Sequence, residues 1–264
     1  MKECNIIIAS FGHEFVDGLL SSIIENTKDV DYAIQVVDNH KDNDKINNIV
    51  KPICEKYNVP LHLDNTLTGY GDVLNKGAEV SEDSKYILYM DSDTKVAKGW
   101  LREMIDCYER HYNEGCRLVG PRVKKFDESY LECMPEYHPD MEFLSNNDIE
   151  LSNKTYLVGV CYLRERATIN EFKWDKNFLR AYWEDNDFTD QVKFWGYKIW
   201  VAGKSLMYHK VNSSHETIKK EGLNPSAVGA SNRSYYMQKW NYITQHKTHP
   251  RIRDMTLGDY FGRE

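Results

Sequence analysis

Short runs of apolar residues alternate with helical patterns from the N-terminus to residue 90. The runs cover 5–9, 32–37, 61–63 and 86–90, and the last is apolar on both faces, as in a buried parallel strand. Between them, apolar residues recur at helical spacing within 15–24 and 46–53, and a further helix is expected at 69–78. This alternation predicts a mostly parallel sheet with right-handed crossovers, flanked by helices.

The second half of the chain is patterned less regularly. We expect a helix after Trp100, strands at 118–120, 155–163 and 197–202, and a helix that stops at Gly196. The acidic segment 124–153 predicts a long loop, which either covers a substrate or is only mobile surface. We expect the regular structure of this α/β domain to end near Lys210.

Two carboxylates follow the apolar run 86–90 directly. Asp91 and Asp93 stand where the strand should end, and ligands of open α/β sheets bind at the carboxyl ends of strands. Carboxylate oxygens suit Mg²⁺ or Mn²⁺, so the pattern is compatible with a metal site that faces a phosphate group. An isolated Asp-x-Asp also suits a turn that closes a strand, and the residues alone leave both open.

Two further strand tips point to the same edge of the sheet. Phe11 follows the first strand and Asp38 follows the second, where a carboxylate could bind a ribose hydroxyl or a base N–H. Asp38 is equally suited to forming a turn. No Gly-x-Gly-x-x-Gly follows the first strand, which argues against a dinucleotide-binding domain.

A second acidic group lies in the run 184–187, Glu-Asp-Asn-Asp. Acids at the start of a helix are favoured by its dipole, so these residues could simply form an acidic first turn with Asp187 facing outward. Taken alone, His209 is more typical of a structural histidine than of a metal ligand.

Composition narrows the class of protein. Residues 204–264 hold ten Lys and Arg against five Asp and Glu, whereas the whole chain has a net charge of −7. A basic segment beside an acidic body suits contact with phosphate or another anion, or simply a solvated face. Six scattered cysteines without a C-x-x-C pair indicate reduced thiols. With no membrane-spanning apolar run and no signal-peptide core, we expect a cytoplasmic protein.

Taken together, the motifs resemble those of GT-A glycosyltransferases, most closely the family 2 type. The matching segments are Asp91-Ser92-Asp93, Gly159-Val160-Cys161-Tyr162-Leu163-Arg164, Trp174-Asp175-Lys176-Asn177-Phe178, Glu184-Asp185-Asn186-Asp187, Gly196-Tyr197-Lys198-Ile199, His209 and Tyr235-Tyr236-Met237-Gln238-Lys239-Trp240. Trp183-Glu184-Asp185 is similar to the Trp-Gly-Gly-Glu-Asp of galactosyl- and N-acetylgalactosaminyl-transferases, although the glycines are missing. Each motif is short, and their joint order covers nearly the whole chain.

The resemblance implies a role for each candidate residue. Asp93, Asp91 and His209 would hold a divalent metal, Mn²⁺ in preference to Mg²⁺, and the metal would bridge the diphosphate of a nucleotide-sugar. Asp185 would be the general base of an inverting transfer, and Glu184 would bind hydroxyls of the sugar or acceptor. The remaining candidates would hold the nucleotide, which is UDP by family frequency; they are Phe11, Asp38, Asp72, Asp91, Ser92 and Lys210, with Lys219 and Lys220 also near the diphosphate.

The resemblance also implies how the chain is divided into domains. Residues 1–210 would form the GT-A catalytic domain, with a nucleotide-binding half at 1–95 and an acceptor half at 96–210. Residues 211–264 would be a basic extension that supplies an active-site loop and a helix.

Other functions remain open from sequence. A sugar nucleotidyltransferase would want a Gly-rich basic loop after the first strand, and a non-catalytic binding module would not need all four of Asp91, Asp93, Asp185 and His209. The acceptor could be a glycan, a lipid-linked sugar, a protein side chain or a modified nucleic-acid base. The C-terminal basic residues could serve a polyanionic acceptor or face solvent; they are His246, Lys247, His249, Arg251 and Arg253.

Overall fold

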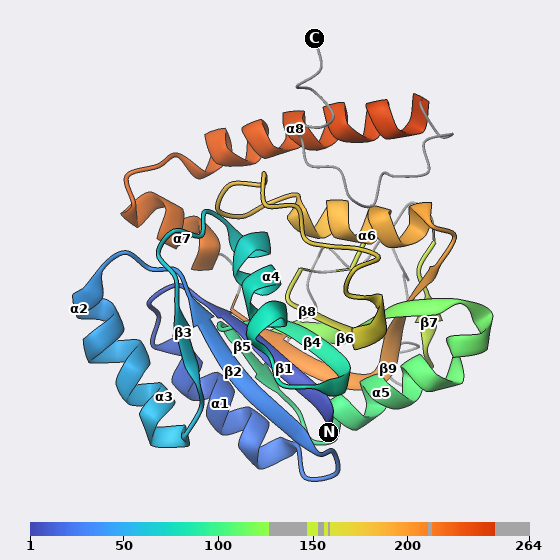
Figure 1. The fold of residues 1–264 in the computed structure, drawn as a ribbon, viewed down its shortest axis with the longest axis horizontal. Coiled ribbons are helices and arrows are strands. Elements are labelled where there is room, and N and C mark those ends of the chain that lie inside the picture. Colours follow the sequence, from blue (N-terminus) through green and yellow to red (C-terminus); the bar gives the residue numbers. More distant parts are fainter. Residues whose placement is uncertain (127–146, 153–155, 158, 211–212, 246–264) are drawn as a thin grey trace.

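A computed structural model describes residues 1–126, 147–152, 156–157, 159–210 and 213–245 (Figure 1). One nine-stranded sheet in the order β3-β2-β1-β4-β8-β6-β9-β5, with β7 paired to β9, forms its centre. Most of the acidic segment 124–153 and the basic cluster beyond residue 245 lie outside the described residues, so the expectations for both segments stay predictions.

The N-terminal half forms the parallel part of the sheet as predicted. Its strands are β1 (Lys2–Ser10), β2 (Tyr32–Asp38), β3 (Leu61–Leu63) and β4 (Ser84–Asp91). β1 lies between β2 and β4, and all three neighbouring pairs are parallel. In this register Ser10 pairs with Asp38 and Ala9 with Asp91, so the candidate residues at the three strand tips lie at one edge.

The second half completes the sheet with mixed directions. Its strands are β5 (Thr94–Val96), β6 (Cys116–Lys125), β7 (Ile149–Glu150), β8 (Cys161–Glu165) and β9 (Lys198–His209). β8 is antiparallel to both β4 and β6, while β6 and β9 are parallel to each other. Six strands therefore run in one direction, and only β5, β7 and β8 of the described strands oppose them, which confirms a mostly parallel sheet.

Helices flank the sheet. They are α1 (Phe15–Asn26), α2 (Asn43–Lys45), the π-helix η1 (Ile46–Val50), α3 (Lys51–Tyr57), α4 (Tyr70–Val80), α5 (Trp100–Arg110), α6 (Glu184–Phe194), α7 (Ser213–Lys220), α8 (Pro225–Gln245), and the short 3₁₀ turns η2 (Tyr112–Glu114) and η4 (Arg166–Thr168). Helix α4 packs closely on the sheet because Gly77 has no side chain; a Cβ there would lie 2.2 Å from Ile7 Cγ2.

An aromatic cluster joins the segment 172–178 and helix α6 to the sheet. The rings of Trp174 and Phe188 stack with 4.2 Å between centroids and an interplanar angle of 7°, and Tyr89 and Tyr162 pack around them. All four side chains are at most 2% exposed. The cluster therefore fixes the 172–178 segment and helix α6 against strands β4 and β8.

Three expectations from the sequence need correction. The strand expected at 155–163 begins only at Cys161, because residues 159 and 160 form a turn, and residues 155 and 158 lie outside the described residues. The strand expected to end near Ala202 continues to His209, because both β6 and β5 pair with its second half. The loop expected at 124–153 is replaced by strand at its described ends, because β6 reaches Lys125 and β7 pairs with β9 at Ile149–Glu150. The extension after Lys210 holds helices α7 and α8, and α8 lies alongside α6 (Figure 1).

Candidate active site

Asp91, Asp93 and His209 meet at the tip of β4. Asp91 ends β4, Asp93 occupies the tight turn between β4 and β5, and His209 ends β9. Because β5 pairs antiparallel with β9, Thr94 lies opposite His209, which brings the imidazole to the acids. One ligand atom from each of the three residues lies within 4.8 Å of the others, and His209 Nε2 is 3.4 Å from Asp93 Oδ2.

The chemistry of this trio fits a divalent cation. Burial raises the pKa of Asp91 well above its ordinary value, and the negative charge of Asp93 raises it further. A bound cation would balance this negative charge. His209 Nδ1 is buried and has no hydrogen-bond partner among the described residues. Two carboxylates with one imidazole are a donor set that Mn²⁺ accepts readily and Mg²⁺ accepts less well.

A cavity opens beside the trio. Phe11 lines it from the turn after β1, Ser92 from the tip of β4, Glu184 from the start of α6, and Ser213 and Thr217 from α7. The cavity therefore lies at the carboxyl ends of the parallel strands, where open α/β sheets bind their ligands. Of the residues predicted to form the site, those lining it are Phe11, Asp91, Ser92, Asp93 and Glu184.

Asp38 and Asp72 are near the cavity but do not line it. Asp38 is 1% exposed, and its two oxygens accept hydrogen bonds from the backbone N–H groups of Gly12 and His40, each at 2.8 Å. Asp72 accepts hydrogen bonds from the backbone N–H and the hydroxyl of Thr68, at 3.1 and 2.9 Å. In this structure both carboxylates shape the turns around the cavity.

The lysines predicted to close over a diphosphate are also outside the lining. The backbone N–H of Lys210 donates to the carbonyl of Asp93 at 3.0 Å, while its Nζ lies 4.0 Å from the centre of the Phe15 ring. Lys219 and Lys220 are exposed on α7. The basic segment 204–264 instead contributes the hydroxyl groups of Ser213, Ser214 and Thr217 to the lining of the cavity.

These hydroxyls are functional candidates that the sequence did not reveal. The Ser213 hydroxyl donates to Asp93 Oδ2, and the Thr217 hydroxyl is 2.8 Å from His13 Nε2. Burial lowers the pKa of His13, which favours the neutral imidazole in this contact. Single serines and threonines in a basic helix carry no local signal, so only the folded arrangement identifies them.

Asp185 lies in the first turn of α6, against Gly159. The absence of a side chain at Gly159 permits the approach, because a Cβ there would lie 3.0 Å from Asp185 Oδ2. The backbone N–H of Asn186 donates to Asp185 Oδ1 at 2.8 Å. Burial nevertheless dominates and raises the pKa of Asp185 to about 6. Asp185 is thus a half-buried carboxylate whose pKa is raised to about 6, beside Gly159 in the wall of the cavity.

Glu184 is the acid of α6 that lines the cavity. It is 9% exposed, lines the cavity, and its Oε2 has no hydrogen-bond partner among the described residues. Burial, followed by the charge of Asp185, raises the pKa of Glu184 well above its ordinary value. An unpaired buried oxygen is costly, so a ligand hydroxyl in the cavity would relieve it.

The residues just before these acids have an unusual backbone. Arg180, Tyr182 and Trp183 have φ values of 66°, 84° and 74°, which is uncommon for large side chains. Asn232 of α8 supports the segment: its Nδ2 donates to the carbonyls of Leu179, Ala181 and Tyr182 at 2.9–3.1 Å, and its Oδ1 accepts the N–H of Leu179. On the other side, Arg180 pairs with Gly69. Such strain persists only where surrounding contacts impose it.

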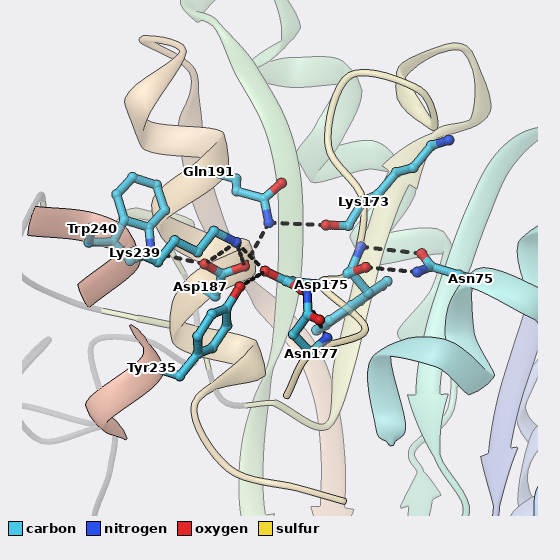
Figure 2. Close-up of polar contacts among 10 residues, drawn as sticks. Asn75, Lys173, Asp175, Asn177, Asp187, Gln191, Tyr235, Lys239 and Trp240 are labelled. Atoms are coloured by element: carbon cyan, nitrogen blue, oxygen red, sulfur yellow. Dashed lines mark hydrogen bonds and ion pairs between the residues drawn. The ribbon is translucent and has the colours of Figure 1, made fainter. Parts of the chain in front are cut away.

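A buried ionic cluster ties α8 to α6 and to the segment 172–178 (Figure 2). Lys239 Nζ is 2.7 Å from Asp175 Oδ2 and 2.8 Å from Asp187 Oδ1. The Tyr235 hydroxyl donates to Asp175 Oδ2 at 2.6 Å, and Trp240 Nε1 donates to Asp187 Oδ1 at 2.9 Å. Three motifs that are far apart in sequence therefore meet behind the acids of the cavity.

A family model described as Glycosyl transferase family 2 matches residues 5–177. No curated protein matches the chain significantly. Among solved structures, GalNAc-T7 with UDP, GalNAc and Mn²⁺ is 12% identical, with a TM-score of 0.61 over 80% of this chain and 43% of that one. S. aureus TarS residues 1–349 in complex with UDP-GlcNAc is 16% identical, with a TM-score of 0.59 over 79% and 58%.

The chain thus spans about half the length of these structures, and at such identities the likeness shows the fold. It is the GT-A fold, as the sequence indicated. Among the described residues no helix is long and apolar enough to cross a membrane. Because the family model matches more than half of the residues, the chain belongs to glycosyl transferase family 2.

Proposed function

We propose that this enzyme transfers a sugar from a UDP-linked donor to an acceptor hydroxyl with inversion, using Asp185 as the general base. The observation that carries the proposal is one cavity with two pairs of acids beside it: Asp91 and Asp93 line it next to His209 at the strand tips, and Glu184 lines it next to Asp185 at the start of α6. The solved structures with UDP, GalNAc and Mn²⁺, and with UDP-GlcNAc, support a uridine donor.

The donor would bind between the strand tips and α7. Asp91, Asp93 and His209 would hold Mn²⁺, or less favourably Mg²⁺. When bound, the metal would neutralise the diphosphate and act as a Lewis acid on the leaving group. Ser213 donates to Asp93 in the present arrangement, so that hydroxyl would reorient as the carboxylate takes up the cation.

The nucleoside would lie along the tips of β1 and β2. Phe11 offers an apolar face for the base, and Ser92 a hydroxyl towards the phosphates. Asp38 and Asp72 would contribute by holding the adjacent turns, and would need to exchange backbone hydrogen bonds to reach a ribose hydroxyl directly. Lys210 would have to leave the Phe15 ring to reach the diphosphate.

Asp185 would remove the acceptor proton. A base works best when its pKa lies near the working pH, and burial brings the pKa of Asp185 to about 6. Glu184, whose Oε2 is unpaired among the described residues, would bind a hydroxyl of the donor sugar or of the acceptor. In this scheme residues 1–95 hold the nucleotide and the metal-binding acids, residues 96–210 supply Glu184 and Asp185, and the described part of the extension, 213–245, braces the site.

A thermal-shift panel of UDP-, GDP-, dTDP- and CDP-sugars, each with Mn²⁺ and with EDTA, tests the proposal. A ligand at 100-fold its Kd stabilises the folded state by about 2.7 kcal/mol. We expect a shift with UDP-sugars that disappears in EDTA. A shift with another nucleotide class would correct the donor, and no shift with any of them would contradict the proposal.

A further inference from the structure

A second cavity adjoins the cavity beside Asp91 and Asp93, in which the donor is proposed to bind and which we name the donor cavity. Tyr182, Trp183, His215 and Gly229 are among the residues that line it, on the segment before α6, on α7 and on α8. Ser214 lines both cavities, and His209, one of the three candidate metal ligands, lines the second one. A molecule in this second cavity would therefore lie next to the place where the donor's reacting carbon is expected.

The described lining of the second cavity carries no permanent charge. It consists of Tyr182, Trp183, His209, Ser214, His215, Pro225, Ser226 and Gly229, with no carboxylate, lysine or arginine. Phosphate-bearing ligands are normally bound by arginine, lysine or helix N-termini. Aromatic rings beside hydroxyl and imidazole groups suit an uncharged ligand that is apolar on one face and rich in hydroxyls at its edge.

Tyr182 is the main aromatic surface of this cavity. Its ring lies on helix α8 at Gly229, where a Cβ would be 3.6 Å from Tyr182 Cδ2. The ring of Trp183 also contacts α8, with 5.2 Å between its centroid and that of Tyr236. Tyr182 and Trp183 both have a left-handed backbone, and Asn232 holds it through the carbonyl of Tyr182. Backbone strain of this kind clusters at ligand-binding sites, which is a second observation in favour of a functional surface.

We infer that the second cavity is the acceptor subsite, and that it takes an uncharged sugar ring stacked on Tyr182. The inference rests on the proposed transferase function and adds the chemical class of the acceptor. A pyranose presents an apolar C–H face to an aromatic ring and hydroxyls at its rim, where Ser226 and His215 offer partners.

The transfer step is balanced within this arrangement. An acceptor hydroxyl loses its proton to Asp185, and its oxygen forms a bond to the anomeric carbon of the donor. The bond from that carbon to the diphosphate oxygen breaks, and its electron pair leaves with UDP. Asp185 lies two residues after Trp183, in the first turn of α6, so the base and the aromatic residues of the second cavity belong to the same stretch of chain.

The test measures UDP release with methyl β-glycosides of glucose, galactose, mannose, N-acetylglucosamine and N-acetylgalactosamine. We expect at least one glycoside to raise the rate above donor hydrolysis in the unaltered protein. Tyr182→Ala should raise the KM for that glycoside at least tenfold and leave the KM for the donor unchanged, while Tyr182→Phe should keep the ring and stay within threefold. Tyr112→Ala, which alters a 41% exposed tyrosine outside both cavities, is the matched control.

A second variant keeps the test decisive if Tyr182→Ala misfolds. Gly229→Leu leaves that backbone intact, since its Cβ meets the Tyr182 ring at ordinary contact distance, and the rest of the leucine would enter the cavity. We expect it to abolish stimulation by the glycoside but to retain UDP binding with Mn²⁺.

The possible failures are distinguishable. If the unaltered protein showed no metal-dependent binding of UDP, the proposed function itself would be contradicted. Normal UDP binding with no stimulation by any glycoside would overturn only the acceptor inference. The same inference would fall if Tyr182→Ala left the glycoside KM unchanged, or if a sugar phosphate or an oligonucleotide were the preferred acceptor.

Discussion

Lys239 and Asp187 form an ion pair of 2.8 Å in which the carboxylate is 1% exposed (Figure 2). Lys239 lies near the end of the last described helix, whereas Asp187 is in the first turn of α6, next to the acids of the cavity. Asp175 shares the same ammonium group at 2.7 Å. One lysine therefore neutralises two buried carboxylates from separate segments, and it connects the C-terminal helix to the candidate active site.

We predict that Lys239→Met destabilises the protein by about 3–5 kcal/mol, because it leaves two buried carboxylates without a cation. Urea unfolding at pH 7 measures this. Lys85→Met is the matched control: Lys85 pairs with Glu109 at the same 2.7 Å, but both side chains are about half exposed, so the loss should stay within about 1 kcal/mol. Equal losses of unfolding free energy in the two variants would show that the buried cluster around Lys239 stabilises the protein no more than an exposed ion pair does.

The sequence predicted much of the fold because local patterns determine it. The run 86–90 is apolar on both faces and became the centre of β4, and the three strands before it lie where the pattern put them. The errors came from tertiary pairing. β9 continues past Ala202 because β5, which is only three residues long, offers it a partner that no local pattern reveals.

The candidate site was predictable where its residues belong to short motifs. Asp91, Asp93 and His209 lie close enough together to hold one cation, and Glu184 lines the same cavity as Asp91 and Asp93, while the role of each stays a prediction. Asp187 could not be placed from sequence, since an acid in a first turn is usually solvated; it is buried because Lys239, more than 50 residues later, folds back over it. The four hydrogen bonds of Asn232 likewise depend on the fold alone.

Asp93→Ala should remove metal-dependent nucleotide binding. The variant loses one carboxylate of the trio and the acceptor of the Ser213 hydroxyl, while the nucleoside pocket remains. Calorimetric titration with UDP in the presence of Mn²⁺ should show at least a tenfold rise in Kd. Asp17→Ala, which removes an exposed partner of Lys56, serves as the control and should bind normally. An unchanged Kd in Asp93→Ala would rule out the metal role.

Asp185→Asn should abolish transfer and leave UDP-sugar binding intact. An amide cannot accept the proton, and loss of a general base lowers the rate by roughly 10²–10⁴-fold. With a pKa of about 6, the unaltered enzyme should lose activity as the pH falls through 6. A rate profile that is flat from pH 5 to 8, or an active Asp185→Asn enzyme, would refute the assignment.

The same raised pKa predicts how stability depends on pH in metal-free protein. The folded state holds the Asp185 proton more tightly than the unfolded state does, so stability is greatest below the ordinary aspartate pKa and is lost as the pH rises through about 6. Asp185→Asn should therefore be more stable than the unaltered protein at pH 8, by about 1–3 kcal/mol. Thermal unfolding in EDTA should show this gain shrinking towards pH 4, and a constant difference would contradict it.

Gly159→Ala tests whether the close approach of Asp185 to the wall of the cavity matters for the reaction. The new Cβ would lie 3.0 Å from Asp185 Oδ2 and 3.1 Å from its Cβ, so the carboxylate must move. A general base displaced by a few tenths of an ångström loses its alignment with the acceptor hydroxyl, and we expect kcat to fall at least tenfold. The Kd for UDP with Mn²⁺ should change less than threefold. Gly18→Ala is the matched control, because its Cβ would meet only the flexible end of Lys95, and kcat should be unaffected. Equal kcat values in the two variants would mean that the position of Asp185 against Gly159 is not the catalytic one.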